Sequence, residues 1–345
     1  MASAKLKGFI GFFKAHPILL LLVLSPGIPE YLSGSSALNE IVLNPASFFI
    51  FLAANLGLYG PGVLLIREAK VRWQKGWATV LLLGAAYGIL EEGIALSTLF
   101  NPLAGPVGKL GVYGHWAGVN WIWTVTILSV HMIFSISLPI LLLGLALPET
   151  RGKSLLVTRR AISATFVIWV VDVTVLLLFV RLAEHFWMGT PVFLGSLAAI
   201  GILVYLAYKV PATTLTTRSF LPTASPLVTG IIGALFYPSV LIVESLGMGA
   251  KLPAVVDLAF VILDQLMFLI VIIRIIGRTN NKRNLIALTA GLIVVLALFG
   301  IVSEIPLALS AIAAVIAVVL LRMLWKKYPA RVPGKLEASV DYALQ

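Results

Sequence analysis

The chain has 345 residues, of which 60% are hydrophobic and only 11% are charged. Soluble domains carry about 25% charged residues, so this composition excludes an ordinary soluble protein and predicts a membrane protein. The formal net charge is +11, but the basic residues lie between apolar stretches, an arrangement that does not favour a nucleic-acid partner. The chain has no cysteine, which excludes disulfides, thiolate metal sites and cysteine nucleophiles.

Ten stretches of the sequence are long and apolar enough to cross a bilayer as helices. A hydrocarbon core about 30 Å thick needs about twenty helical residues, because each residue rises 1.5 Å. The runs are continuously apolar, whereas barrel strands alternate between polar and apolar residues. We therefore expect an all-α, polytopic transmembrane helical bundle. The expected spans are residues 9–29, 47–66, 77–98, 117–147, 161–181, 191–208, 226–245, 253–274, 284–302 and 305–324.

The basic residues predict the orientation of these spans. With the amino terminus in the cytoplasm, the alternation of ten spans leaves only Lys109, Arg181 and Lys251 of the 25 basic residues outside. Cytoplasmic loops of membrane proteins are enriched in lysine and arginine. The expected location is therefore the cell membrane, with several passes and both termini in the cytoplasm. No convincing small-residue cleavage site follows the first stretch, so we expect it to be retained.

No long polar linker divides the chain. Residues 1–327 are expected to form a single transmembrane domain and residues 328–345 a polar cytoplasmic tail. The sequence of residues 88–92 (GILEE) resembles that of residues 300–304 (GIVSE), at equivalent positions in the third and ninth predicted spans. This match indicates a weak repeat of helices 1–3 in helices 7–9, although chance similarity between apolar segments is the simpler explanation.

The third predicted span contains two consecutive carboxylates, Glu91 and Glu92. An ionisable side chain at the centre of a membrane helix costs about 2.5–3.5 kcal/mol, so both residues need a partner or a function. Gly84, Gly88 and Glu92 are spaced by four residues, which gives one narrow helix face able to approach a neighbouring helix closely. We expect Glu92 to point into the bundle. The structural alternative is a buried carboxylate satisfied by hydrogen bonds.

The fourth predicted span carries a polar stripe. Asn120, Thr124, His131 and Ser135 fall within about 60° of one another on a helix. A histidine at this depth can bind a metal, move a proton or hydrogen-bond another helix. Because consecutive spans are antiparallel, we expect Glu91 or Glu92 to approach His131, with His115 contributed by the connecting segment.

Other acidic residues lie near the predicted membrane. Glu30, Glu244 and Glu304 are placed near outer helix ends, where they could form a cation vestibule, although solvation at the interface is the simpler interpretation. Asp172 and Asp264 lie deeper. The sequence contains no phosphate-binding loop, dinucleotide fingerprint or convincing serine-elbow motif, so nothing in it indicates a nucleotide-driven pump.

Paired glutamates in one membrane helix and a histidine in the next resemble the CAAX-processing and bacteriocin-processing (CPBP) intramembrane protease family. The similarity covers about 50 residues. In that family the pair begins a Glu-Glu-x-x-x-Arg motif and the histidine ends a Phe-x-x-x-His motif, whereas Leu96 and Ile127 stand at the arginine and phenylalanine positions here. The resemblance implies that one glutamate activates water, and that His131, with Asn120 or His115, holds a metal or stabilises an oxyanion.

The sequence therefore predicts a membrane-embedded, protease-like hydrolase that uses a divalent metal such as zinc. The candidate catalytic residues are Glu91, Glu92, His131 and Asn120, and the candidate metal ligands are Glu92, His131 and His115. The expected partners are the lipid bilayer and a membrane peptide, lipid or ion substrate, with no nucleic acid. Two alternatives remain open, an ion- or proton-coupled secondary transporter and a non-catalytic membrane scaffold.

Overall fold

The computed structural model describes residues 11–36, 43–214, 225–278, 281–303 and 309–329. Over these residues the protein is a helical bundle with one short hairpin, in which β1 (His115–Trp116) pairs with β2 (Val119–Asn120) in antiparallel register. The all-α fold expected from the sequence is confirmed. The helical segments are α2 (Pro17–Pro26), η1 (Gly27–Leu32), α4 (Pro45–Arg72), α5 (Trp77–Gly88), η2 (Ile89–Ala95), η3 (Gly105–Val107), α6 (Leu110–Tyr113), α7 (Trp121–Val130), η4 (His131–Ser137), α8 (Leu138–Ala146), η5 (Pro148–Thr150), α9 (Arg159–Ala183), α10 (Thr190–Lys209), α11 (Pro226–Gly249), α12 (Ala254–Arg278), α13 (Lys282–Ser303) and α14 (Ser310–Lys327).

Eight helices among the described residues are long and apolar enough to cross a membrane, and they match the second to ninth predicted spans in order. They are Pro45–Arg72, Trp77–Ala95, Trp121–Ala146, Arg159–Ala183, Thr190–Lys209, Pro226–Gly249, Ala254–Ile276 and Lys282–Ser303. The first predicted span corresponds to a shorter helix, Pro17–Leu32. The tenth corresponds to α14, an 18-residue helix whose last turns carry Arg322, Lys326 and Lys327.

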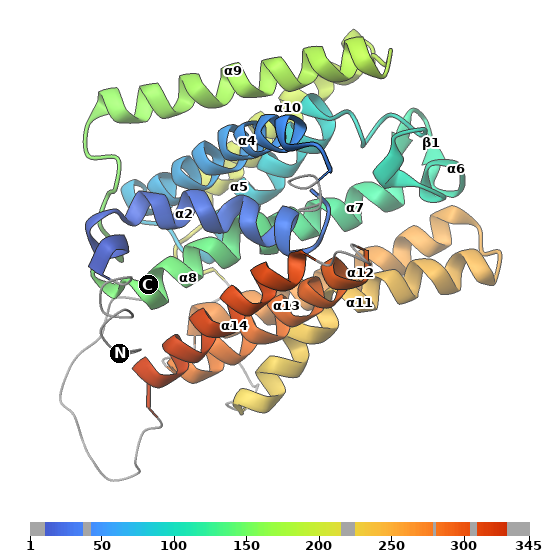
Figure 1. The fold of residues 1–345 in the computed structure, drawn as a ribbon. Coiled ribbons are helices and arrows are strands. Elements are labelled where there is room, and N and C mark those ends of the chain that lie inside the picture. Colours follow the sequence, from blue (N-terminus) through green and yellow to red (C-terminus); the bar gives the residue numbers. More distant parts are fainter. Residues whose placement is uncertain (1–10, 37–42, 215–224, 279–280, 304–308, 330–345) are drawn as a thin grey trace.

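The helices differ sharply in how deeply they are buried. The most apolar windows of Trp77–Ala95 and Trp121–Ala146 are 72% buried, whereas those of α9 and α10 are 11% buried. Figure 1 shows α9 along one edge of the bundle and α11 to α14 on the opposite side, with α5, α7 and α8 between them. The two central spans are the ones in which the sequence places Glu91, Glu92 and His131. Their side chains therefore lie among protein rather than lipid.

Glycines allow α11 and α13 to pack backbone against backbone. A Cβ atom at Gly291 would lie 1.9 Å from the carbonyl oxygen of Gly230, and one at Gly233 would lie 2.4 Å from the carbonyl oxygen of Leu288. Small residues allow such close helix packing in membrane bundles, where the hydrophobic effect does not drive helices together because lipid is itself apolar. The contact joins α11 to α13 within the part of the bundle that α11 to α14 form.

Part of the sequence prediction falls outside the described residues. Glu304 lies there, as does most of the tail at residues 328–345. The repeat inferred from residues 88–92 and 300–304 consequently stays a prediction.

We expect Gly291→Ala to lower the free energy of unfolding by about 1–3 kcal/mol, because the added methyl group must push the two backbones apart. Thermal unfolding in mild detergent, followed by tryptophan fluorescence, measures the change. Gly201→Ala is the matched control, because a Cβ atom at Gly201 meets nothing within 4 Å. Equal effects of the two substitutions would contradict the proposed close contact.

Candidate functional site

Two glycines bring α5 against the helix that carries His131. A Cβ atom at Gly84 would lie 3.1 Å from the Cα of Met132, and one at Gly88 would lie 2.7 Å from Cδ2 of Leu128. The predicted narrow face is therefore confirmed, and it packs against the following span. As the chain continues past Gly88, this approach places the two glutamates beside the histidine.

Glu91, Glu92 and His131 form a compact buried group. Their exposed fractions are 1%, 7% and 2%. His131 Nε2 lies 3.0 Å from Glu92 Oε1, and His131 Nδ1 lies 3.2 Å from Glu91 Oε2. One imidazole thus contacts both carboxylates through different nitrogen atoms. The expected approach of the glutamate pair to His131 is confirmed.

Each member of this group lies in a π-helical turn. Glu91 and Glu92 belong to η2, and His131 begins η4. The backbone amide of Leu96 donates to the carbonyl oxygen of Glu91 at 2.8 Å, which is the i to i+5 bonding of a π-turn. Such turns are rare and are frequent at functional sites. The third π-helix among the described residues, η1, carries Glu30.

Hydrogen bonds from neighbouring side chains fix the group. The Thr98 hydroxyl donates to Glu92 Oε2 in a short contact and accepts a hydrogen bond from Trp123 Nε1 at 3.1 Å. His131 Nδ1 lies 2.9 Å from Ser135 Oγ, so this member of the predicted polar stripe contacts the histidine. Both Glu92 and the imidazole ring are therefore held in one orientation before any ligand binds.

Two tyrosines, Tyr59 and Tyr87, lie beside His131. The rings of Tyr59 and Tyr87 lie 6.2 and 5.8 Å from the imidazole, centroid to centroid. The Tyr59 hydroxyl donates to Glu30 Oε1 at 2.5 Å, which links Glu30 to the site. The Tyr87 hydroxyl is buried and interacts with the Glu91 carboxylate. Tyr87 lies four residues before Glu91, a spacing that places both on one side of a helix, whereas Tyr59 belongs to a different helix and had no such signal.

His115 and Asn120 form a separate pair on the hairpin. His115 Nδ1 lies 2.6 Å from Asn120 Oδ1, and the two residues are register partners of β1 and β2. The Asn120 amide donates to the carbonyl oxygens of Thr98 and Asn101 at 2.7 and 3.0 Å. Asn120 therefore holds the segment that carries Thr98, while neither residue belongs to the compact group.

The remaining acidic candidates lie elsewhere in the bundle. Glu244 is only 5% exposed and accepts a hydrogen bond from Thr126, so the interpretation of interfacial solvation is wrong for this residue. Packing of α11 and α12 near α7 buries it. Asp264 accepts hydrogen bonds from Ser239 and Gln265. Asp172 is partly buried on α9, where its Oδ1 would lie 2.5 Å from a Cβ atom at Gly57.

The donor set of the compact group suits a divalent metal ion. Glu91, Glu92 and His131 each offer one ligand atom, and these atoms lie within 4.8 Å of one another. Glu91 Oε2 is buried and pairs with His131 Nδ1 at 3.2 Å. Imidazole nitrogen and carboxylate oxygen are zinc ligands, and catalytic zinc sites use three protein ligands and leave a fourth position open. The residues present therefore fit such an ion.

Comparisons with known proteins add no relative. No family model matches the sequence, and searches of curated proteins and of solved structures give no match. The resemblance to the CPBP family consequently stays a prediction based on the glutamate pair and the histidine.

We expect His131→Ala to lower the free energy of unfolding by about 3–5 kcal/mol, because it leaves two buried carboxylates without their shared partner. The same substitution should cost much less in a Glu91→Gln/Glu92→Gln background, where no buried charge is left behind. Unfolding in detergent with a chelator present measures all variants. His115→Ala, outside the group, should cost the same in both backgrounds, and an equal cost for His131→Ala would contradict the coupling.

Proposed function

We propose that this chain is a membrane-embedded hydrolase in which Glu91, Glu92 and His131 bind a divalent metal ion, such as zinc, and activate water. The observation that carries the proposal is the convergence of three metal-ligating side chains, all buried, from two π-helical turns. Groups of this kind are expensive inside a membrane protein, so their retention favours a function over a purely structural role.

The geometry supports a different role for each member. A bound divalent ion supplies Lewis acidity and lowers the pKa of a bound water. Glu92 and His131 are the metal ligands with the better fixed orientation, because Thr98 hydrogen-bonds Glu92 and Ser135 contacts His131. Glu91 pairs with His131 through Oε2 at 3.2 Å, and we propose that its carboxylate would bind the ion through one oxygen and accept the proton of the attacking water through the other. It then returns this proton to the leaving group as the scissile bond breaks.

Two further residues complete this assignment. Tyr87 has a buried hydroxyl that interacts with the Glu91 carboxylate, its ring lies next to the imidazole, and it is our candidate donor to the substrate oxygen. Asn120 acts as a positioning residue, because its amide holds the backbone around Thr98. The similarity to CPBP proteases favours a peptide bond within the membrane as the target, and a membrane lipid is the second substrate class.

We also propose that residues 1–327 form one membrane domain in the cell membrane, with ten spans and both termini in the cytoplasm. The eight long apolar helices support eight of these spans, and the bias of basic residues supports the direction. The finding that residues Pro17–Leu32 and α14 are also apolar helices is compatible with a total of ten. Reporter fusions at the loops between helices test this topology.

A second candidate function is ion- or proton-coupled transport. It is favoured by the extension of the buried group towards Glu30, because Tyr59 hydrogen-bonds Glu30 and packs against His131. Chains of titratable residues are the usual proton pathways of membrane transporters. The same residues would then exchange ions or protons instead of activating water.

The metal content of the purified protein tests the hydrolase proposal. It is measured by mass spectrometry after purification in mild detergent. We expect about one divalent transition metal per folded wild-type chain. Glu92→Gln and His131→Ala should lose most of it, because each removes one of three ligands. The control Glu244→Gln should keep the metal, since it changes a carboxylate of similar burial outside the group.

Two outcomes would count against the hydrolase. Well-folded wild-type protein without metal, even after incubation with zinc, would remove the basis of the proposal and favour proton-coupled transport. Accumulation of zinc inside proteoliposomes, abolished by Glu92→Gln, would show that the ion is cargo. A hydrolase predicts bound zinc without accumulation.

A further inference from the structure

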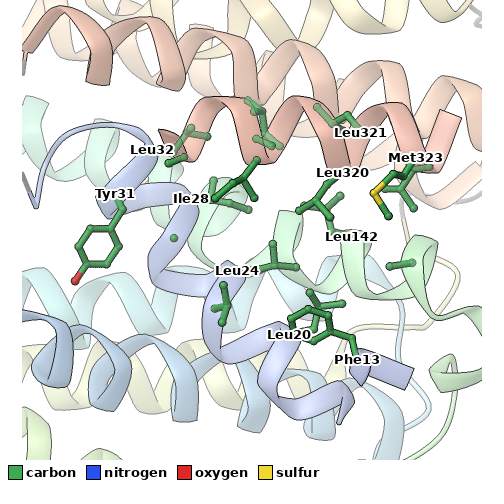
Figure 2. A pocket seen from close by; sticks show the side chains of 18 of the residues that line it. Phe13, Leu20, Leu24, Ile28, Tyr31, Leu32, Leu142, Leu320, Leu321 and Met323 are labelled. Atoms are coloured by element: carbon green, nitrogen blue, oxygen red, sulfur yellow. The ribbon is translucent and has the colours of Figure 1, made fainter. Parts of the chain in front are cut away.

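An apolar groove runs between α2–η1 and α14, away from the group around His131. Its volume is about 660 Å³. Figure 2 shows Leu20, Leu24 and Ile28 on one wall and Leu320 and Leu321 of α14 on the other. Pockets of a few hundred cubic ångströms with apolar linings are typical of sites for small amphiphilic ligands.

The charged residues that line this groove lie at one end, where α14 finishes. They are Lys326 and Lys327. Lys327 Nζ donates to the carbonyl oxygen of Ala146 at 2.8 Å, and Ala146 is itself part of the lining. Burial, together with the neighbouring cations Arg151 and Lys14, lowers the pKa of Lys327 although Glu149 opposes this effect.

The basic end of the groove has an excess of positive charge. Lys14, Arg151 and Lys327 are close enough to influence one another, and Glu149 is the one acidic residue that contributes to the environment of Lys327. Glu149 is already paired with Lys14 at 3.6 Å. This end of the groove therefore favours the binding of an anion. Basic pockets between membrane helices bind the headgroups of anionic lipids by this mechanism.

The dimensions of the groove suit an acyl chain. α14 has 18 residues and is about 27 Å long, close to the thickness of a bilayer core. An extended peptide would leave its backbone amides and carbonyls without partners along the apolar walls, which is costly inside a membrane. A hydrocarbon chain has no such groups. An apolar tail joined to an anionic head matches both ends of the groove.

We propose that this groove binds an anionic phospholipid, with an acyl chain between Ile28 and Leu321 and the phosphate group beside Lys326 and Lys327. The lipid would bridge the amino-terminal helix α2 and the last helix α14 of the described chain. The proposal is independent of the hydrolase assignment, because none of the groove residues it uses belongs to the group around His131.

Native mass spectrometry of the full chain, titrated with dioleoyl-phosphatidylglycerol, tests the proposal. We expect saturable binding of one lipid that is at least tenfold tighter than binding of dioleoyl-phosphatidylcholine. Glycerol phosphate, which has the anionic group without the acyl chains, should not compete. Lys326→Gln/Lys327→Gln should weaken binding of phosphatidylglycerol about 30-fold, as two charges near an anionic headgroup are removed.

A second variant tests the acyl chain. Gly27 lines the groove, and a Cβ atom there meets nothing within 4 Å, so Gly27→Leu should fill the groove without a backbone clash and reduce binding at least tenfold. The controls are Gly195→Leu, also in open space, and Arg159→Gln/Arg160→Gln, an exposed basic pair at the start of α9. Neither control should change the affinity.

Three results would overturn the proposal. They are equal affinity for the two phospholipids, unchanged binding in both the lysine and Gly27 variants, and absence of saturable binding by the folded wild-type chain. The last result is expected if another occupant, such as a segment of this chain or a second copy, covers the groove. Size-exclusion chromatography and thermal unfolding establish that each variant is folded before its binding is compared.

Discussion

The contact of the glycine face of α5 with η4 determines where the polar residues of this bundle meet. Gly84 and Gly88 let the helices approach so closely that a Cβ atom would lie 3.1 Å from the Cα of Met132 or 2.7 Å from Cδ2 of Leu128. The helix then widens into a π-turn, and both glutamates of η2 lie against His131. Without this approach the two buried carboxylates would lose the imidazole that both of them contact, which is costly in an apolar interior.

The rest of the central bundle maintains this arrangement. Thr98 and Trp123 fix Glu92, Ser135 fixes the imidazole, and Asn120 holds the backbone at Thr98. A hydrogen-bonded network of this kind is stable in a low-dielectric interior only when nearly all of its members are satisfied. Glu91 Oε2 pairs with His131 Nδ1 at 3.2 Å, and the buried Tyr87 hydroxyl lies in the same environment and interacts with the Glu91 carboxylate.

The sequence predicted the helical fold well because its signals are strong and local. Continuous apolar runs predicted ten spans, eight of which match helices long and apolar enough to cross a membrane, and the four-residue spacing from Gly84 to Glu92 predicted the buried face of α5. The proximity of the glutamate pair to His131 followed from the antiparallel packing of consecutive spans. The π-turns could not be predicted, because they arise from tertiary packing and leave no periodic pattern. The contact of Tyr59 with His131 joins segments far apart in the sequence and could not be predicted from spacing. Glu244 was misjudged because packing of α11 and α12 buries a helix end that hydropathy alone places at the interface.

The measurement that most directly tests the central claim is X-ray absorption spectroscopy of the purified chain loaded with one equivalent of zinc. We expect a first shell of nitrogen and oxygen at about 2.0–2.2 Å, with the signature of a single imidazole. Replacement of His131 by alanine should remove that signature, while His115→Ala should leave the spectrum unchanged. A shell with two or more imidazoles, or a spectrum indifferent to His131, would contradict a metal site formed by Glu91, Glu92 and His131.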